Sequence, residues 1–236
     1  IRAEEVTGLA TEPMPTLAEL DRQREQLTDV AEFDFREEVP LTQFQIWGTD
    51  GRFQRDAKGL RIEMPGFDQW TATGLAPRFR LDGDFDISLK MDVLELEAAA
   101  RRGESTVYIE TEIAGERGTS VETKYAIDST GRRDVEVQIR RREPNGQFDY
   151  HEVNRTQSDH IHELRLARRG DVAYFIFRDR PENQPIVLSR IRAGEGPIPD
   201  GSFRALVHTG GAGRKTVVRF RNLTVRSEQL SWTDSN

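Results

Sequence analysis

Residues 85–93 read FDISLKMDV, and apolar and polar side chains alternate strictly along this segment. Its apolar members are Phe85, Ile87, Leu89, Met91 and Val93. A period of two places alternate side chains on opposite faces of a β-strand, so the segment predicts a strand with one face in a core and one polar face. After Val93 the apolar phase shifts to Leu94 and Leu96, which predicts a β-bulge.

The same alternation recurs along most of the chain. It predicts further strands at 107–113, 121–127, 135–139, 147–153, 160–167, 172–178, 186–192, 203–208 and 216–226. Turn-forming dipeptides punctuate them, namely Asp-Gly at 50–51, 82–83 and 200–201 and Asn-Gly at 145–146. Both dipeptides suit hairpin turns, so a turn is expected at 82–83. Many short strands that are polar on one face predict an all-β fold in which two antiparallel sheets stack as a sandwich.

One N-terminal α-helix is also expected. The segment TLAE at 16–19 matches a capping box, and Leu17, Leu20 and Leu27 follow at near-helical spacing, which predicts a helix over 17–31. We therefore expect an acidic arm and connector helix over 1–32, a β-sandwich over 33–227 and a C-terminal tail over 228–236. Residues 1–45 carry 11 acids and 4 bases.

Composition excludes several classes of function. The chain has no cysteine, which rules out disulfides and thiol catalysis. Its longest apolar run, VAYFIF at 172–177, is far below the about 20 residues that a membrane helix needs. The net charge is −7 and the densest basic run is RRR at 140–142, so no footprint for nucleic acid is expected.

The order of several sequence blocks resembles a known superfamily. The blocks are FDFREEVPLTQFQIWG, KGLRIEMPG, LAPRFRLDGDFDISLKMDV, HELRLARRGDVAYFIFRD and KTVVRFRNLTV. Together they resemble the concanavalin A-like lectin/glucanase jelly roll, and in particular a group of uncharacterised bacterial domains. The resemblance implies a jelly-roll sandwich and favours an exported or cell-surface location. It does not choose between lectins, hydrolases, adhesion modules and spacers.

Catalysis would require paired carboxylates. Hydrolases of the resembled superfamily carry E-x-D-x-E on one strand, and the nearest match is Glu110-Thr111-Glu112, with Asp92 as a further candidate. Same-face neighbours on a strand lie ~6.5–7 Å apart, a spacing that two-carboxylate hydrolysis allows. The third acid of the motif is absent, so an exposed charge ladder with Lys90, Lys124 and Arg140 is favoured over catalysis.

Two groups of residues are candidates for metal binding. The acids Asp82, Asp84 and Asp86 in LDGDFD suggest calcium, but the glycine does not stand where a calcium loop needs it, so a turn and a strand are favoured. His160 and His162 are two apart and would share one face of a strand. The cupin spacing around them is missing, so no metal or other cofactor is expected, with calcium as the alternative.

Sugar rings stack on aromatic side chains, and Trp70 lies in the loop-like stretch PGFDQWTATG. We group it with Tyr108, Glu110, Lys124 and Gln138, on the polar face of the predicted strands, as candidate ligand-binding residues. The first hypothesis is a non-catalytic module that binds a polysaccharide or another glycan. The alternatives are a glycoside hydrolase or related enzyme with a degenerate acid pair, and a structural or interaction domain partnered by other domains of a longer chain.

Overall fold

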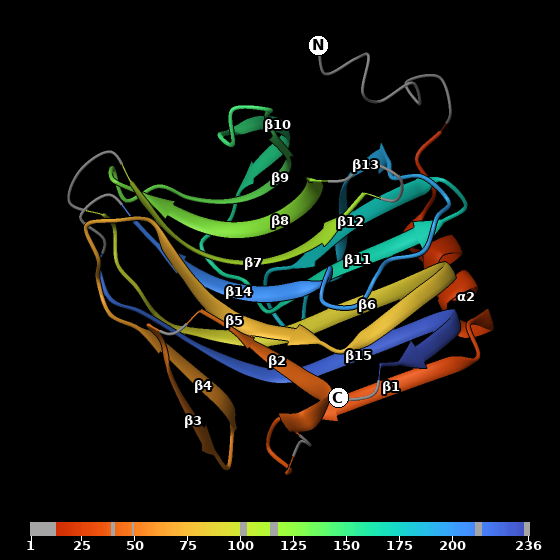
Figure 1. Ribbon diagram of the computed structural model, residues 1–236, viewed down its shortest axis with the longest axis horizontal. Coiled ribbons are helices and arrows are strands. Elements are labelled where there is room, and N and C mark those ends of the chain that lie inside the picture. The colour runs from red at the N-terminus through yellow and green to blue at the C-terminus, as the bar shows by residue number, and fades with distance from the viewer. Residues whose placement is uncertain are drawn as a thin grey trace.

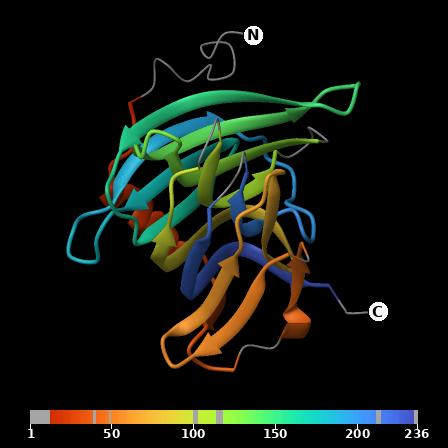
Figure 2. The same ribbon diagram turned by 90° about the vertical axis from the view of Figure 1, so that its left-hand side faces the viewer.

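A computed structural model describes residues 13–38, 41–48, 50–99, 103–113, 118–210 and 214–233. Two antiparallel sheets stack face to face, as Figure 1 and the side view in Figure 2 show. The predicted all-β sandwich with one N-terminal helix is therefore confirmed. No helix in the described part of the chain is long and apolar enough to cross a membrane.

The first sheet has eight strands. Its order is β13 (Ile186–Arg192), β12 (Val172–Arg178), β11 (Glu163–Arg169), β6 (Phe79–Leu96), β15 (Thr216–Trp232), β4 (Gly59–Met64) and β3 (Arg52–Asp56), and β1 (Asp29–Asp34) pairs with β15 beyond the end of β4. The long strands β6 and β15 lie side by side at its centre, and every pairing is antiparallel.

The second sheet has seven strands. Its order is β10 (Phe148–Gln157), β9 (Arg133–Arg142), β8 (Thr119–Asp128), β7 (Glu104–Glu112), β14 (Arg204–Thr209), β5 (Thr71–Pro77) and β2 (Phe44–Trp47), with the short 3-10 helix η1 (Leu41–Gln43) before β2. In β7, β8 and β9 the odd-numbered residues face the core and the even-numbered residues face away from it. Val107 and Ile109 on β7 are core residues, for example, whereas Glu110 lies on the opposite face.

The core lies between the two sheets. The first sheet contributes the apolar row of β6, and Phe85, Ile87, Leu89 and Met91 are each at most 1% exposed. Each such side chain contributes about 1.5–3 kcal/mol by leaving water. Alternation of apolar residues along β6 therefore predicted the core face of this strand correctly.

The pairing of β6 with β15 is interrupted by a β-bulge near the end of β6. Val93 pairs with Val218 and Glu95 with Val217, which leaves Leu94 as the extra residue of a bulge, as predicted. The prediction of a hairpin turn at 82–83 is wrong, because β6 continues through these residues without a turn.

Gly83 marks a second bulge in β6. Ser227 pairs with Phe85 and Gln229 with Asp82, so two residues of β6 oppose one residue of β15. Gly83 has a φ of 71°, and a Cβ placed on it would lie 1.9 Å from Glu228 Oε2. The Asp-Gly pair therefore supplies the positive φ of a bulge and not that of a hairpin.

The N-terminal helix α2 (Leu17–Gln26) packs on the outer face of the first sheet and is shorter than the predicted 17–31. Its capping box is present, since Thr16 Oγ1 accepts from the Glu19 N–H and Glu19 accepts from the Thr16 N–H at 2.7 Å. Residue 29 already begins β1, because Asp29–Asp34 pairs with β15. Strand β15 itself continues past residue 227 to Trp232.

A buried ion-pair network joins the helix to the sheet. Asp86 on β6 is fully buried and accepts hydrogen bonds from Arg165 Nε at 2.9 Å and Nη2 at 2.8 Å. Arg165 also donates to Asp21 on α2 at 2.5 Å, and Arg24 on α2 lies 3.5 Å from Asp86. The polar row of β6 is thus partly covered by the helix.

Candidate functional site

A cavity of about 700 Å³ opens on the face of the second sheet that points away from the core. We call it the sheet cavity. Its lining comes from β5 and the segment before it, β7, β8, β9, β10 and β14, and consists of Trp70, Thr71, Ala72, Glu104, Thr106, Tyr108, Glu122, Lys124, Gln138, Arg140, Tyr150, Arg155 and His208. Its volume falls within the range of ligand sites in proteins, about 300–1,000 Å³.

Lys124 lies at the floor of this cavity and is held by two carboxylates. Its Nζ is 2.8 Å from Glu104 Oε1 and 3.2 Å from Glu136 Oε2. Burial lowers the pKa of Lys124, but Glu104 and Glu136 outweigh this effect, so its pKa is raised and the ammonium is charged at neutral pH. Arg155 contacts Glu136 at 2.6 Å from the other side. The floor is therefore a compensated ion-pair network.

Glu110 borders the cavity and is 1% exposed. Arg140 Nη2 lies 2.9 Å from its Oε2 and Arg204 Nη1 lies 2.7 Å from its Oε1. Each arginine is covered by an aromatic ring, since Arg204 lies 4.2 Å from the Trp47 ring centroid and Arg140 lies 4.9 Å from that of Phe148. Two guanidinium groups, each in contact with an aromatic ring, therefore hold the Glu110 side chain in place.

Glu122 differs sharply from its neighbours. It pairs in register with Glu110 across β7 and β8 and is 6% exposed. Among the described residues it has no ion-pair partner, and its Oε1 is buried without a hydrogen bond. Burial, reinforced by the negative charge of Glu110, raises the pKa of Glu122 to about 7. The cavity therefore contains a carboxyl group that titrates near neutrality.

The wall at the β5 and β14 side is aromatic. Trp70 stacks on His208 with ring centroids 4.8 Å apart and an interplanar angle of 23°. Gly210 makes room for the indole, because a Cβ there would lie 2.3 Å from Trp70 Cε3. Burial lowers the pKa of His208 to about 4, so this imidazole is neutral at pH 7. Trp70 is 54% exposed, and Tyr150 on β10 is 56% exposed.

Four of the five residues predicted to bind a ligand line this one cavity. They are Trp70, Tyr108, Lys124 and Gln138, and the fifth, Glu110, lies beside it in contact with Arg140. Gln138 donates to Glu136 at 3.0 Å, which orients its amide. Their assignment as ligand-binding residues stays a prediction.

Sequence reasoning missed several members of the site, including Glu122, Glu104, Arg140, Tyr150 and His208. A signal for them was present in the register. Tyr108 pairs with Lys124 and Glu110 with Glu122, and Glu122 pairs in turn with Gln138. Once one polar row was assigned to this face, the neighbouring strands placed Glu122 and Arg140 on it as well.

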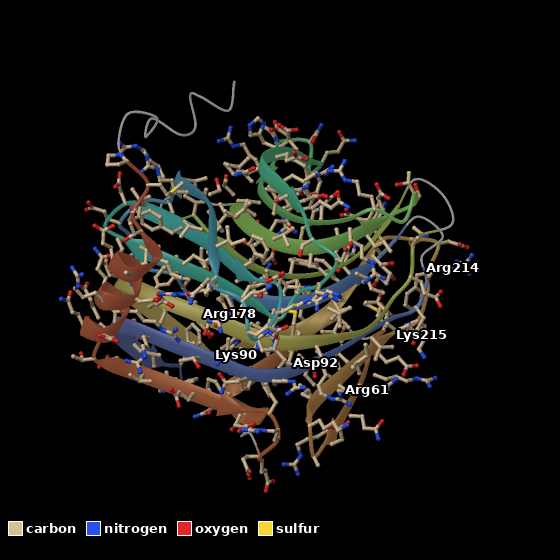
Figure 3. The ribbon with its side chains drawn as sticks, turned by 180° about the vertical axis from the view of Figure 1, so that it is seen from behind. Arg61, Lys90, Asp92, Arg178, Arg214 and Lys215 are labelled. Carbon is tan, nitrogen blue, oxygen red and sulfur yellow. The ribbon has the colours of Figure 1, made fainter. Side chains whose placement is uncertain are left out.

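The three catalytic candidates do not form one site. Asp92 and Lys90 lie on β6 of the first sheet, and Figure 3 shows them in the view from behind. Asp92 is 2.6 Å from Arg221 Nε. Glu112 is half-buried at the end of β7 and does not line the cavity. Asp92 therefore cannot act with Glu110, and Lys90 does not belong to a charge ladder with Lys124 and Arg140.

The metal candidates are also dispersed. Asp82 is paired with Arg80 at 2.9 Å, Asp84 accepts from the Gly170 N–H, and Asp86 is bound by arginines. Strand β11 begins only at Glu163, so His160 and His162 lie in the connection before it and not on a strand as predicted. Across the described ranges, no three histidine, aspartate or glutamate side chains gather in a way that could hold a metal ion.

The family is decided by a match over the whole chain. Residues 1–49 and 48–236 match the model described as "Protein of unknown function (DUF1583) C domain". The chain belongs to the DUF1583 family. No curated protein matches this DUF1583 C domain.

Solved structures similar to this DUF1583 C domain share its sandwich. The Crh5 transglycosylase in complex with NAG has 11% identity and a TM-score of 0.53 over 86% of each chain. The VIP36 exoplasmic/lumenal domain in its Ca²⁺/Man3GlcNAc-bound form has the same identity and TM-score over 86% of this chain and 90% of its own. The CBM2 module of the Lactobacillus casei BL23 phage J-1 evolved Dit also scores 0.53 at 11% identity, over 87% and 96%. At this identity the likeness shows the fold alone, which is that of the concanavalin A-like lectins and glycosidases, as the sequence blocks predicted.

Proposed function

We propose that the domain binds a carbohydrate chain in the sheet cavity. The observation that carries this proposal is the combination of an exposed aromatic wall with buried polar atoms that lack partners. Thr106 Oγ1, Glu122 Oε1 and Arg140 Nε are all buried without a hydrogen bond. Buried polar groups are nearly always satisfied in native proteins, so such a cluster inside one cavity favours a hydroxyl-rich ligand.

The aromatic residues suit the apolar faces of sugar rings. One face of Trp70 is occupied by His208, and the indole remains half exposed. Tyr150 and Tyr108 present rings and hydroxyl groups from β10 and β7 to the same cavity. Because tyrosine and tryptophan combine a large apolar surface with a polar group, they contribute much of the contact energy of such sites.

Binding partners in a longer chain are part of the same proposal. The matched family model is described as a C domain, which supports a module that acts beside other domains. The similar structures include an exoplasmic/lumenal domain, a transglycosylase in complex with NAG and a CBM2 module. They support a glycan as the partner and an exported or cell-surface location.

The test is calorimetric titration with oligosaccharides selected from a broad glycan panel. Trp70→Ala should lower the affinity at least about tenfold, because stacking and the ordered His208 are both lost. Trp232→Ala removes another half-exposed tryptophan, which packs on Phe33 and Phe79, and should leave the affinity unchanged. Equal affinity of the wild type and Trp70→Ala, or no binding across the panel, contradicts the proposal.

A sugar-processing enzyme is the second candidate, and one observation favours it. Glu110 and Glu122 face each other across neighbouring strands, and burial raises the pKa of Glu122 to about 7. Glu122 would donate a proton to the glycosidic oxygen while Glu110 stabilises the positive charge that develops on the sugar. Binding ranks first because both oxygens of Glu110 already contact arginines, which leaves it poorly placed to attack a sugar carbon.

Product analysis separates these two functions. Ligands that bind are incubated with the domain and the products are resolved by chromatography. Cleavage or transfer that Glu122→Gln abolishes establishes the enzyme. Intact ligand after prolonged incubation with the wild type excludes it and leaves the binding module.

A further inference from the structure

Among the described charged residues around the sheet cavity, one stands outside the ion pairs. Four basic side chains, Lys124, Arg140, Arg155 and Arg204, form ion pairs with the four carboxylates Glu104, Glu110, Glu136 and Glu152. The pairs form two clusters, one of Lys124 and Arg155 with Glu104, Glu136 and Glu152, and one of Arg140 and Arg204 with Glu110. Each member has its partners within its own cluster. Glu122 is the fifth carboxyl group and the only one of the nine residues without a partner in either cluster.

Glu122 is one of the residues that line the cavity. Nine-tenths of its surface is buried. The charged and titratable groups around it come from its own strand and from three others, and are Glu104, Tyr108 and Glu110 on β7, Lys124 on β8, Arg140 on β9 and Tyr150 on β10. The charges of Lys124 and Arg140 lower the pKa of Glu122 in part, but both side chains form their ion pairs with other carboxylates.

A buried carboxyl group without a partner is unfavourable in either protonation state. The ionised form lacks a counter-charge, and the neutral form leaves its oxygen unbonded. A ligand that brings a cation with N–H donors would remove both penalties at once through a charge-assisted hydrogen bond. A hydroxyl group would satisfy an oxygen but not the charge, and a uronic acid would place a second carboxylate beside Glu122 and Glu110.

We propose that Glu122 receives the protonated amine of an amino sugar, so that the glycan bound in the sheet cavity carries free amino groups. This inference rests on the proposed function and names its ligand class. It orders three classes of oligosaccharide by affinity, with amino sugars first, neutral sugars second and acidic sugars last. It also assigns Glu122 as the residue that sets this order.

The test compares three probes of equal length by calorimetry, namely oligomers of glucosamine, of glucose and of galacturonic acid. The wild type should bind the glucosamine oligomer about tenfold or more tightly than the glucose oligomer, and Glu122→Gln should bring this ratio close to one. Glu182→Gln, in the exposed turn between β12 and β13, changes the net charge equally and should retain the wild-type ratio.

Proton release is the second readout. At pH 6 the amine is charged and free Glu122 is mostly protonated, because its pKa is about 7. Pairing with the amine ionises Glu122, so titrations in buffers of different ionisation enthalpy should show release of about one proton in the wild type and none in Glu122→Gln.

The outcomes separate the inference from the proposed function. Binding of the neutral oligomer with no preference for the amine, or a preference that survives Glu122→Gln, overturns the inference and leaves carbohydrate binding intact. If no oligomer of any of the three classes binds, both are overturned.

Discussion

Glu110 and Glu122 lie directly opposite each other on β7 and β8, yet only Glu110 is held by arginines. Directly opposed like charges destabilise a sheet, so the pair is tolerated because one member is neutralised by partners and the other by protonation. The asymmetry makes Glu122 the most informative residue of the site. We expect it to affect the pH dependence of stability and, under the proposed function, the choice of ligand.

Stability should fall as Glu122 is forced to ionise. The pKa of Glu122 is about 4.5 when exposed and about 7 in the folded state, so between these values the unfolded chain loses its proton and the folded chain keeps it. Folded-state stability therefore decreases from pH 4.5 to pH 7 on account of this residue. Glu122→Gln should be more stable than the wild type by about 1–3 kcal/mol at pH 8 and about equal to it at pH 4.5.

Urea unfolding of both proteins across this range measures the difference. His208 has the opposite effect, because its folded pKa of about 4 makes stability rise with pH from 4 to 6.5. Subtracting the unfolding free energy of Glu122→Gln from that of the wild type at each pH removes the contribution of His208, which is the same in both proteins. A difference that does not change with pH would contradict the assignment of Glu122.

The network around Asp86 should hold α2 to the sheet. Asp86→Ala leaves Arg165 and Arg169 buried without their shared carboxylate, which should cost about 3–5 kcal/mol of unfolding free energy. Asp82→Ala removes a solvent-exposed pair with Arg80 and should have a much smaller effect. Equal losses in chemical denaturation would show that the buried pair is not special.

Gly210 should control the position of Trp70. Gly210→Ala places a methyl group where the indole now packs, so the ring must leave His208. We expect a several-fold loss of glycan affinity together with a red-shifted tryptophan emission, as the indole becomes more exposed. Thermal unfolding serves as the control for folding, and unchanged affinity with a displaced ring would remove Trp70 from the site.

Glycan binding should not depend on calcium through the acids that the sequence first suggested. Asp82 and Asp86 are paired with arginines and Asp84 is hydrogen-bonded to the Gly170 amide, so none is free to bind an ion without breaking these contacts. Affinity measured before and after treatment with EDTA should agree. A loss that added Ca²⁺ restores would contradict this prediction.

The sequence predicted the strands because a period of two is a local property of the chain. Ile87 and Leu89 could be assigned to a core without knowing what covers them. Which sheet a polar row belongs to is not local, and the rows of Asp92 and Glu110 look alike in sequence although they lie on different sheets. The burial of Asp86 was likewise hidden, since a helix distant in sequence covers it.

The sequence predicted only part of the site, because some of its residues can be recognised locally and others only from contacts between strands. Trp70 and Tyr108 were recognised by residue type, and they do line one cavity. Glu122 was missed because it stands out only once the ion pairs of Lys124 and Arg140 with other carboxylates are known. Those ion pairs join different strands and cannot be read from the sequence of one strand. His208 was missed as well, although it lines the cavity and stacks on Trp70.

The most direct test of carbohydrate binding in the sheet cavity is a map of ligand-induced chemical-shift changes in the isotope-labelled domain. Titration with a bound oligosaccharide should shift the indole N–H of Trp70 and the amides of β7, β8 and β9 around Tyr108, Glu122 and Gln138. The indole of Trp232 and the amides of β6 should stay in place. Shifts confined to the first sheet, or none at all at saturating ligand, would contradict the account.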